Sequence, residues 1–449
     1  MKHLPQSNGS LAMAAWRLAL SIAGAWWVGS ASVVAADAFV AGADFSHLGF
    51  FEDRGVVYRD ADEAKDGLRI LKSHGVNCVR LRLFTSSADQ ARRDPYNYTN
   101  NLDYTLPLAV RAKAAGLRVF LDFHYSDTWA DPGKQAKPIA WTNLTFTELE
   151  QRIYDYTRNT LEAFRAAGAP PDLVQVGNEI TPGLLWTDGR VGGAYDTTQQ
   201  WLQLGRLLRA AIRGVTDSTA PTTTRPKIVI HLDRGGDWNA TMWYFDRLLQ
   251  QGVEFDIIGE SYYPWWHGSL TALRTCLSNA VARYHKPVLI AETAFPWATN
   301  GAAIVGITPG VDGQVQFLLE LAKILKGLPE QAGVGLCWWG AEYQQVPKVG
   351  LAGFDTRSFF DRAGNSLPVV EALGRLADPV ALRASFTEAA LLLQWPLSGA
   401  GMTLTTTSNL SAAGVWWAAT NPVQTTGVVF STTLPLTADH TRFFRLESR

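Results

Sequence analysis

The sequence lacks a disulfide framework. It contains three cysteines, Cys78, Cys276 and Cys337, which are odd in number and far apart. Exported proteins that need disulfides usually carry an even number of cysteines. Cys78 and Cys337 lie within apolar runs, so we predict buried free thiols. There is no Cys-x-x-Cys pair and no His/Cys metal-ligand spacing, which argues against a structural zinc site.

The chain also lacks an excess of charge of either sign. Lys plus Arg total 40 and Asp plus Glu total 41, so the formal net charge is −1. No basic stripe is present, and we therefore expect no nucleic-acid partner. Hydrophobic residues make up 47% of the chain and mean hydropathy is −0.03, which is typical of a globular protein rather than a disordered or membrane protein.

Residues 1–36 have the pattern of an export signal. Lys2 and Arg17 supply positive charge, Leu18 to Gly29 is a short apolar stretch, and Val34-Ala-Ala36 offers a cleavage context. A membrane anchor is the alternative, but the apolar stretch is shorter than the ~20 residues that a span needs. We expect a secreted or periplasmic protein that acts as a monomer and has no stable membrane association.

Eight short apolar runs alternate with helical patterns. They are Phe39–Ser46, Val76–Phe84, Leu117–Tyr125, Leu173–Ile180, Lys227–Asp233, Phe255–Tyr263, Lys286–Thr293 and Gly333–Gly340. Helical spacing is visible between several runs, in Asp103–Gly116, Glu148–Gly168 and Thr197–Val215. Eight alternating units predict an α/β fold, a (β/α)8 TIM barrel over residues 37–378. An open doubly wound sheet is the alternative, and no Gly-rich phosphate loop after the first strand supports it.

The pattern changes after about Leu376. Residues 384–449 contain Thr-rich alternating stretches separated by Gly, Asn and Pro turns, which predicts a small C-terminal all-β domain with antiparallel strands. We place the boundary near Asp378-Pro379. Trp416 and Trp417 are adjacent and would point to opposite faces of a strand. Carbohydrate or cell-surface binding is one role for this domain, and a structural or sorting role is the one we favour.

Two glutamates stand where apolar runs should stop. Glu179 follows Leu173–Asn178, and Glu292 follows Pro287–Ala291. Parallel-barrel enzymes place their chemistry at the C-terminal ends of strands, and paired carboxylates cleave glycosidic bonds. A single strand-end glutamate is more often an ordinary residue paired with arginine. Asn178 beside Glu179 favours function, because an amide there can hydrogen-bond a sugar hydroxyl.

Polar residues on two other strands belong to the same predicted face. Arg80 and Arg82 lie two apart and share one face of the second strand. One of them could hold a carboxylate such as Glu292 ionised, and a structural ion pair is the alternative. The polar loop after the third strand carries His124 and Trp129. We predict that His124 contacts sugar and transfers no proton.

Aromatic residues crowd the predicted C-terminal face of the barrel, where flat rings can stack on sugars. They are Trp129, Trp186, Trp265, Trp266, Trp297 and Trp339. Core packing is the alternative for any one of them, and it is our interpretation for Trp338 or its neighbour. We predict that Tyr262, at the end of the sixth strand, donates a hydrogen bond to the Glu292 carboxylate.

These residues resemble glycoside hydrolase family 53, the endo-β-1,4-galactanases of clan A, over about Phe39 to Tyr343. The matching stretches are Gly42–Ser46, Glu52-Asp53, Ile70–Asn77, Val79–Arg82, Asp122–Pro132, Val176–Ile180, Gly183–Trp186, Ile230–Asp233, Ser261–Pro264 and Glu292-Thr293. The long stretch Asp122–Pro132 followed by Asn178-Glu179 is specific to the family, whereas Asn-Glu by itself would suggest only the clan.

The resemblance implies a retaining mechanism with Glu179 as general acid/base and Glu292 as nucleophile. It implies a polysaccharide substrate, β-1,4-galactan or type I arabinogalactan. The residues expected to bind substrate are Arg80, His124, Asn178, Tyr262, Trp339, Asp44, Trp129, Trp186 and Trp266. Another β-1,4-glycan (mannan, xylan or cellulose) and a non-catalytic glycan-binding barrel are the alternatives.

The chain departs from the family pattern at two places. Family members usually show Trp-Glu-Pro after the eighth strand, where this chain has Trp339-Gly-Ala-Glu342. The loop Ala294–Asp312 has neither a cysteine pair nor an Asp-rich tract, whereas some members brace this loop with a disulfide or with calcium. We therefore expect no cofactor and no metal site, and we leave the length of the products open.

Overall fold

The structure, a computed structural model, describes residues 38–220, 224–298, 301–387, 390–411, 414–435 and 441–447. The predicted signal peptide, residues 1–36, lies outside the described residues. Over the ranges that the structure describes, no helix is both long enough and apolar enough to cross a bilayer.

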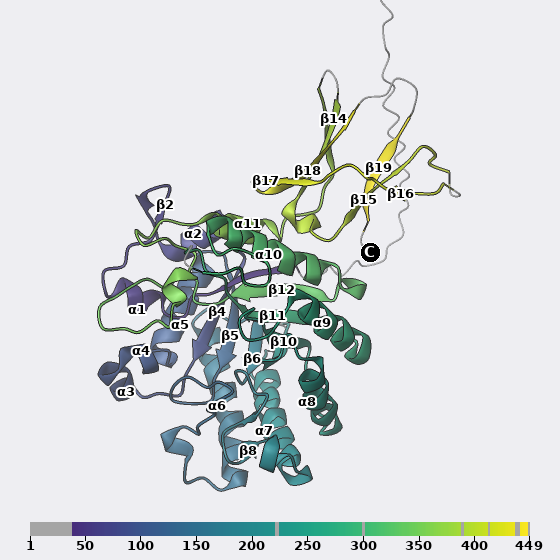
Figure 1. The fold of residues 1–449 in the computed structure, drawn as a ribbon. Coiled ribbons are helices and arrows are strands. Elements are labelled where there is room, and N and C mark those ends of the chain that lie inside the picture. Colours follow the sequence, from purple (N-terminus) through teal and green to yellow (C-terminus); the bar gives the residue numbers. More distant parts are fainter. Residues whose placement is uncertain are drawn as a thin grey trace, which may run out of the picture. The chain divides into compact units, whose positions relative to one another are not determined.

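Eight parallel strands close into a barrel (Figure 1). Around the barrel their order is β1 (Val40–Asp44), β12 (Gly333–Trp338), β11 (Val288–Thr293), β10 (Ile257–Ser261), β9 (Lys227–Leu232), β6 (Leu173–Val176), β5 (Arg118–Phe123) and β4 (Cys78–Leu83). Each apolar run predicted from the sequence contains one of these strands, and the pairing of β1 with β12 closes the sheet. The TIM-barrel prediction is confirmed.

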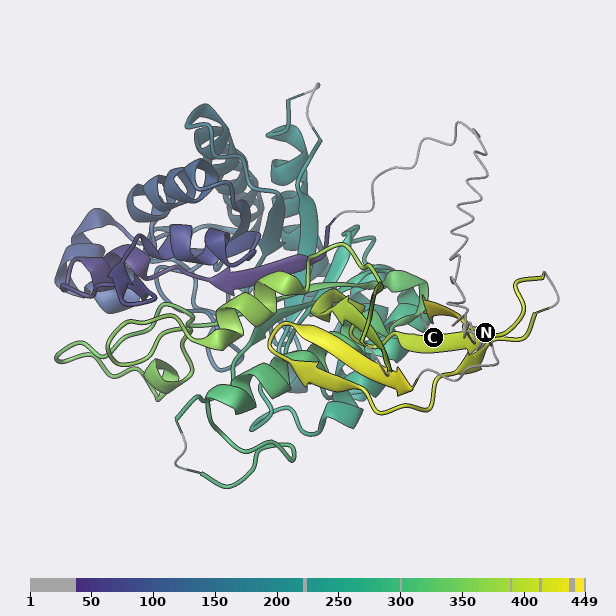
Figure 2. The ribbon, with the colours of Figure 1, turned by 90° about the horizontal axis from the view of Figure 1, so that it is seen from above.

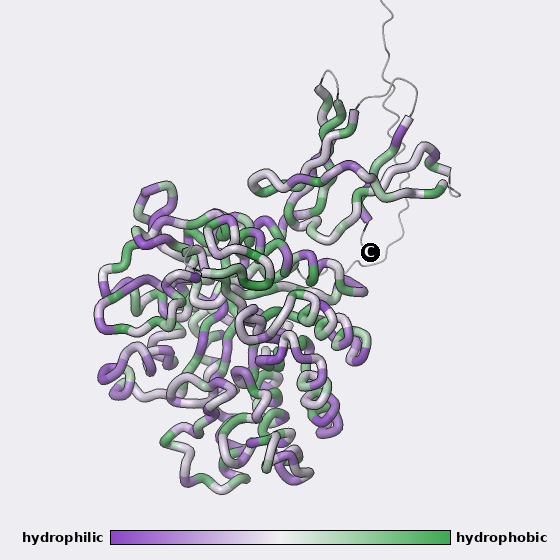
Figure 3. The backbone as a smooth tube through the Cα atoms, in the orientation of Figure 1, coloured by the Kyte–Doolittle hydropathy of each residue, from purple (hydrophilic) through white to green (hydrophobic). Residues whose placement is uncertain are grey.

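One principal helix follows each barrel strand. In chain order these are α2 (Gly67–Ser73), α5 (Leu102–Ala114), α6 (Phe146–Ala166), α7 (Thr198–Asp217), α8 (Trp238–Gln250), α9 (Leu270–Tyr284), α10 (Val311–Lys326) and α11 (Pro368–Arg375). Thr145 and Glu148 form a capping box at the start of α6. Helix α7 buries Trp201, Leu204 and Leu208, three positions on one helical face, and Figure 3 shows hydrophobic and hydrophilic residues alternating along the outer helices.

Smaller elements lie in the loops between these units. They are α1 (Leu48–Glu52), the hairpin β2 (Arg59–Asp60)–β3 (Glu63–Ala64), α3 (Ala88–Arg93), α4 (Pro95–Tyr98) and the hairpin β7 (Gly183–Leu184)–β8 (Gly189–Arg190).

The barrel interior changes from apolar to polar along the strands. Each of the eight strands contributes one side chain to an apolar layer inside the barrel. Its members are Val40, Cys78, Phe120, Leu173, Val229, Ile257, Leu289 and Cys337. Two residues further on, four strands carry Arg80, Asp122, Gln175 and His231, none with exposed surface. Inward positions recur every second residue, so this polar layer rests on the apolar one.

A register shift in the barrel brings Glu292 to the inward face. Strand β10 pairs Glu260 with Ile290 and then Ser261 with Glu292, which leaves one residue of β11 without a partner. An extra residue of this kind re-aims the side chains that follow it. Leu289 belongs to the inward apolar layer, so regular alternation would have turned Glu292 outward, towards the helices.

The three cysteines are free and buried, as predicted. Cys78 and Cys337 belong to the apolar layer, and Cys276 lies on the buried face of α9. Burial raises the pKa of each thiol, to about 12 for Cys78. The thiols are therefore protonated core residues at neutral pH.

After α11 the described residues form two antiparallel sheets that are separate from the barrel sheet (Figure 2, yellow). One has the order β13 (Arg383–Phe386), β14 (Ala390–Pro396), β18 (Val429–Pro435), β17 (Gln424–Thr426), and the other the order β16 (Trp417–Ala418), β15 (Thr403–Thr407), β19 (Phe443–Glu447). The predicted all-β character is confirmed. Trp416 packs 4.0 Å from the Arg445 guanidinium, whereas Trp417, in β16, is 55% exposed, so the two rings differ in environment.

Candidate active site

Glu179 lies just after β6, where the chain turns sharply. Gly177 has a φ of 95° and Glu179 a φ of 49°. A Cβ atom at residue 177 would lie 2.6 Å from the Ile180 side chain, so the turn requires glycine there. The turn lets the consecutive side chains of Asn178 and Glu179 both reach polar groups of the barrel interior.

The carboxyl of Glu179 lies beside the strand pair that carries Glu292. Its Oε1 is 2.7 Å from Ser261 Oγ, and Ser261 is the β10 residue paired with Glu292 in the register of the sheet. Burial raises the pKa of Glu179 well above its usual value, and the like charges of Glu292 and Asp233 raise it further. A carboxyl that keeps its proton near neutral pH is what a general acid requires.

Glu292 is held by a cation and a phenol. Its Oε1 lies 2.8 Å from Arg80 Nη1, and its Oε2 accepts a 2.9 Å hydrogen bond from Tyr263 Oη. Burial raises the pKa of Glu292, and the Arg80 charge acts against that rise. The two glutamates therefore have different surroundings, one beside a serine and one paired with an arginine.

Arg80 connects the acidic groups inside the barrel. Besides Glu292 it donates to Asp44 Oδ2 at 3.0 Å and to Asp122 Oδ2 at 2.8 Å. It also donates to Gln175 Oε1 at 3.0 Å and to Asn178 Oδ1 at 2.9 Å. A buried arginine needs such acceptors. The structural ion pair and the contact with Glu292, which we weighed as alternatives, both exist.

Asp44 lies deeper than we predicted for a substrate-binding residue. It has no exposed surface. Its Oδ2 accepts from Arg80, and its Oδ1 accepts from Arg82 Nη1 at 3.0 Å and from Ser46 Oγ at 2.7 Å. Because β1 directs this side chain into the barrel beside both arginines, its oxygens are already occupied. Asp44 orients the arginines, and its predicted contact with sugar stays a prediction.

Tyr262 does not contact Glu292, so that prediction was wrong. Its Oη donates to Gly268 O at 2.8 Å, and its ring stacks on Phe317 of α10 at 6.3 Å. The hydrogen bond to Glu292 comes from Tyr263. Alternation explains the error: Ser261 faces the barrel interior, so Tyr263 shares its side and Tyr262 faces the helices.

His124 is buried, and its two ring nitrogens have different surroundings. Its Nδ1 accepts from Ala130 N at 2.9 Å, and its Nε2 lies 3.0 Å from Asp122 Oδ2. Burial lowers the pKa of His124, which keeps the ring neutral. Its predicted contact with sugar stays a prediction.

The aromatic residues form two groups, one beside Arg82 and one beside Tyr263. Trp129 lies beside Trp339, with ring centroids 6.2 Å apart, and the Arg82 guanidinium is 4.4 Å from the Trp129 ring. On the Tyr263 side, Trp265 and Trp266 are 5.6 Å apart, and Trp266 is 64% exposed.

The remaining tryptophans have other settings. Trp186, just after β7, packs against Arg190 at 4.1 Å, and Trp297 donates from its backbone to Thr356 O. Trp338 is fully buried, in agreement with the core role that we assigned to it or its neighbour.

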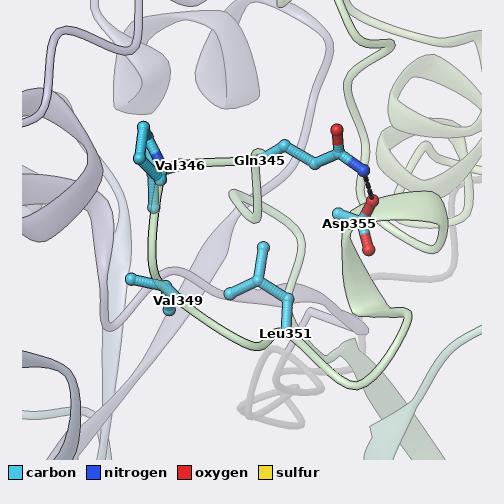
Figure 4. Close-up of a pocket in the computed structure, with 6 residues that line it drawn as sticks. Gln345, Val346, Val349, Leu351 and Asp355 are labelled. Atoms are coloured by element: carbon cyan, nitrogen blue, oxygen red, sulfur yellow. Dashed lines mark hydrogen bonds between the residues drawn. The ribbon is translucent and has the colours of Figure 1, made fainter.

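The loop after β12 supports the Trp339 side of the site. The Phe354 ring lies 4.3 Å from the Trp339 ring. A pocket of about 470 Å³ in this loop is lined by Gln345, Val346, Pro347, Val349, Leu351 and Asp355 (Figure 4). Glu342, in the stretch that departs from the family pattern, is buried and accepts from His47 N at 2.7 Å. Burial raises its pKa to about 8.

Among the residues that the structure describes, no three His, Cys, Asp or Glu side chains gather in a way that could hold a metal ion. The described residues include the loop after β11, apart from residues 299 and 300.

Ser261, Tyr263 and His231 are site residues that we did not select from the sequence. His231 Nδ1 lies 3.1 Å from Asn178 Oδ1, and its Nε2 lies 2.9 Å from Ser261 Oγ. Burial lowers the pKa of His231 well below its usual value, and Arg80 lowers it further. The available signal was the presence of polar residues at alternate positions of otherwise apolar strands, a pattern that points into the barrel.

Comparison with known proteins identifies relatives of this barrel. The model of a family described as glycosyl hydrolase family 53 matches residues 40–373. An arabinogalactan endo-beta-1,4-galactanase from Thermothelomyces thermophilus is 35% identical over 348 residues, covering 75% of this chain and 98% of that protein. The solved Ignisphaera aggregans GH53 catalytic domain is 36% identical with a TM-score of 0.68, covering 76% of this chain and 96% of that one. A solved fungal beta-1,4-galactanase is 33% identical with a TM-score of 0.66, covering 74% and 98%.

Proposed function

The chain belongs to glycosyl hydrolase family 53 and is a glycosidase, and on this premise we propose that it is a retaining endo-β-1,4-galactanase. The substrate is β-1,4-galactan or type I arabinogalactan, as in pectin side chains. The name of the Thermothelomyces thermophilus relative, which matches over nearly its whole length, supports this substrate.

The reaction uses the two glutamates in two steps. Glu179 gives its proton to the glycosidic oxygen as that bond breaks, while a Glu292 oxygen attacks the anomeric carbon and forms a galactosyl ester. A water molecule then attacks the anomeric carbon. Glu179 takes the proton of that water, the ester bond breaks, and sugar leaves with its original configuration.

One observation carries this assignment: the two carboxyls differ in their partners. Glu292 is paired with the Arg80 cation and accepts from Tyr263, which favours the ionised form that a nucleophile needs. Among the described residues Glu179 forms no ion pair, and burial together with Glu292 favours its protonated form. Environments that push two carboxyl pKa values apart separate acid from nucleophile.

The test is hydrolysis of potato galactan by the wild type and by Glu179→Ala and Glu292→Ala, measured as reducing ends. We expect rapid hydrolysis by the wild type and severe loss in both variants. Full activity in either variant contradicts the assigned roles. Assays on purified mannan, xylan and cellulose test the identity of the substrate independently of the catalytic roles. Hydrolysis of one of these without hydrolysis of galactan would mean that the substrate is a different glycan. Binding of galactan without turnover by the wild type would indicate a glycan-binding barrel.

We also propose that the protein is exported through residues 1–36 and acts as a monomer. Expression of the full chain with its N-terminal segment, followed by mass measurement of the extracellular or periplasmic product and by light scattering, tests both. Retention of residues 1–36 in a cytoplasmic product contradicts export, and a dimer mass contradicts the monomer.

A further inference from the structure

We propose that Ser261 and His231 are positioning residues that hold Glu179 protonated before catalysis. This inference rests on the proposed function of Glu179 as acid/base. It follows from the direction of each hydrogen bond in a chain that begins at Arg80.

The first direction is fixed by Arg80, because a guanidinium can only donate hydrogen bonds. Its Nη2 lies 2.9 Å from Asn178 Oδ1, so that atom accepts. The other end of the Asn178 amide agrees, since its Nδ2 donates to Ala130 O at 2.9 Å. The amide therefore presents its oxygen to His231.

The second direction is the tautomer of His231. Its Nδ1 lies 3.1 Å from Asn178 Oδ1, and two acceptors cannot share a hydrogen bond, so Nδ1 carries the hydrogen. The ring is buried beside Arg80 and stays neutral. A neutral imidazole has one N–H, so Nε2 is an acceptor.

The third direction follows at Ser261. Its Oγ lies 2.9 Å from His231 Nε2 and 2.7 Å from Glu179 Oε1. The single hydroxyl hydrogen satisfies Nε2, which leaves only lone pairs facing the carboxyl. The contact with Glu179 is then a hydrogen bond only if Glu179 donates, and so only if Glu179 is protonated. Because Arg80 can only donate, the direction of each later hydrogen bond is set, and the last one requires Glu179 to be the donor.

Other charged and titratable groups face the same site. Glu292 and Asp233 raise the pKa of Glu179, whereas a Ser261 hydroxyl that donates to the carboxylate, and the Arg80 charge, lower it. Tyr263 interacts with both glutamates. His231 in turn interacts with Asp122, His124 and His267 as well as Arg80. None of these groups dictates the direction of the Ser261 bond. A serine free to donate to Glu179 would favour the carboxylate, whereas one committed to His231 favours the acid.

The two directions of the Ser261 bond shift the pKa of Glu179 in opposite senses, so a pH profile distinguishes them. The basic limb of kcat/KM against pH reports ionisation of the general acid in the free enzyme. In Ser261→Ala the protonated form loses its acceptor, so we expect this limb on soluble galactan to move to lower pH by about half a unit to one unit. A limb that stays in place, or moves to higher pH, overturns the proposal.

A second variant and a control complete the test. His231→Phe frees the Ser261 hydroxyl to donate to Glu179, so the basic limb should also move to lower pH. The double variant should shift no further than Ser261→Ala alone, and a fully additive shift contradicts the proposal. Thr157→Val removes another buried hydroxyl, on α6, and should leave the limb unchanged. Thermal melting identifies any unfolded variant, and absence of galactan hydrolysis in the wild type would reject the proposed function instead.

Discussion

Tyr263 Oη donates a 2.9 Å hydrogen bond to Glu292 Oε2, while the adjacent Tyr262 donates in the other direction, to Gly268. Two neighbouring phenol hydroxyls thus have different partners: one donates to the proposed nucleophile, and the other to a backbone carbonyl outside the barrel interior. The pair supplies a matched set of substitutions in which only one of two buried hydroxyls touches the chemistry.

Tyr263→Phe should lower kcat on galactan by about 10- to 100-fold, because a hydrogen bond to a charged group contributes about 1.5–3 kcal/mol. Tyr262→Phe removes an equally buried hydroxyl and should keep kcat within about twofold, with a loss of about 1 kcal/mol in the free energy of unfolding. Steady-state kinetics and urea denaturation of both variants measure this. Equal losses of kcat would contradict the assignment of Tyr263.

Arg80→Gln should move the acid limb of kcat/KM to higher pH. Arg80 lowers the pKa of Glu292. Without the cation that pKa rises, so the nucleophile becomes ionised only at higher pH. The same change leaves Asp44 and Asp122 without their cation, and breaking a buried ion pair costs about 3–5 kcal/mol. A pH–rate profile and a urea titration check both effects, and an acid limb at the wild-type position would exclude the Arg80–Glu292 pairing from catalysis.

Glu179→Ala should slow galactan hydrolysis by about 10²- to 10⁴-fold, the usual contribution of a general acid. An aryl galactoside with a very acidic leaving group needs no proton, so its first step should slow far less and a product burst should appear. Parallel measurement of the two substrates tests this. An equal slowing on both would remove the proton-donor role from Glu179.

Trp266→Ala should weaken substrate binding with little loss of stability. The ring is 64% exposed, and covering it with sugar removes apolar surface from water, about 1–2 kcal/mol or a 5- to 30-fold rise in KM. Trp338→Ala is the contrast, because this fully buried ring should cost about 3–5 kcal/mol of stability. Unchanged KM in Trp266→Ala would remove it from the substrate-binding set.

Stability should fall as pH rises, in part through Glu260. This side chain is buried outside the catalytic pair, where it accepts from Arg234 N and Thr241 Oγ1, and burial raises its pKa to about 8. An unfolded glutamate titrates near about 4.3. Between these values the folded chain holds a proton that the unfolded chain has lost, so unfolding becomes easier as pH increases.

Glu260→Gln should therefore reduce the fall in Tm between pH 5 and pH 8, since an amide has no proton to lose. Glu254→Gln, at an exposed position, is the control and should leave the fall unchanged. Melting curves of the three proteins at both pH values decide the matter. A fall in Glu260→Gln as large as that of the wild type would contradict the linkage.

The strands and helices could be read from the sequence because each apolar run is bounded by polar turns, and because eight repeats leave few alternatives to a barrel. Glu179 and Glu292 could be found for a related reason, since strand ends meet at one edge of a parallel barrel. The position of Tyr263 was also readable, because alternation from Ser261 places it inward, and our choice of Tyr262 ignored that rule.

Other features were not accessible from periodicity. The offset between β10 and β11 comes from pairing across strands, and no local pattern in β11 announces it. The burial of Asp44 was not predicted for a similar reason. Its burial depends on Arg80 and Arg82 reaching it from the adjacent strand, a contact that becomes visible only when β1 and β4 are paired.

The unpaired residue in β11 has a consequence for protein engineering. It reverses the alternation of the strand: each β11 side chain after it faces the side opposite to the one that regular alternation would give. In a regularly paired strand that kept Ala291, Glu292 would face outward, away from Arg80, while its distance along the chain would be almost unchanged. A nucleophile grafted from this barrel onto another scaffold therefore has to travel with its irregular strand.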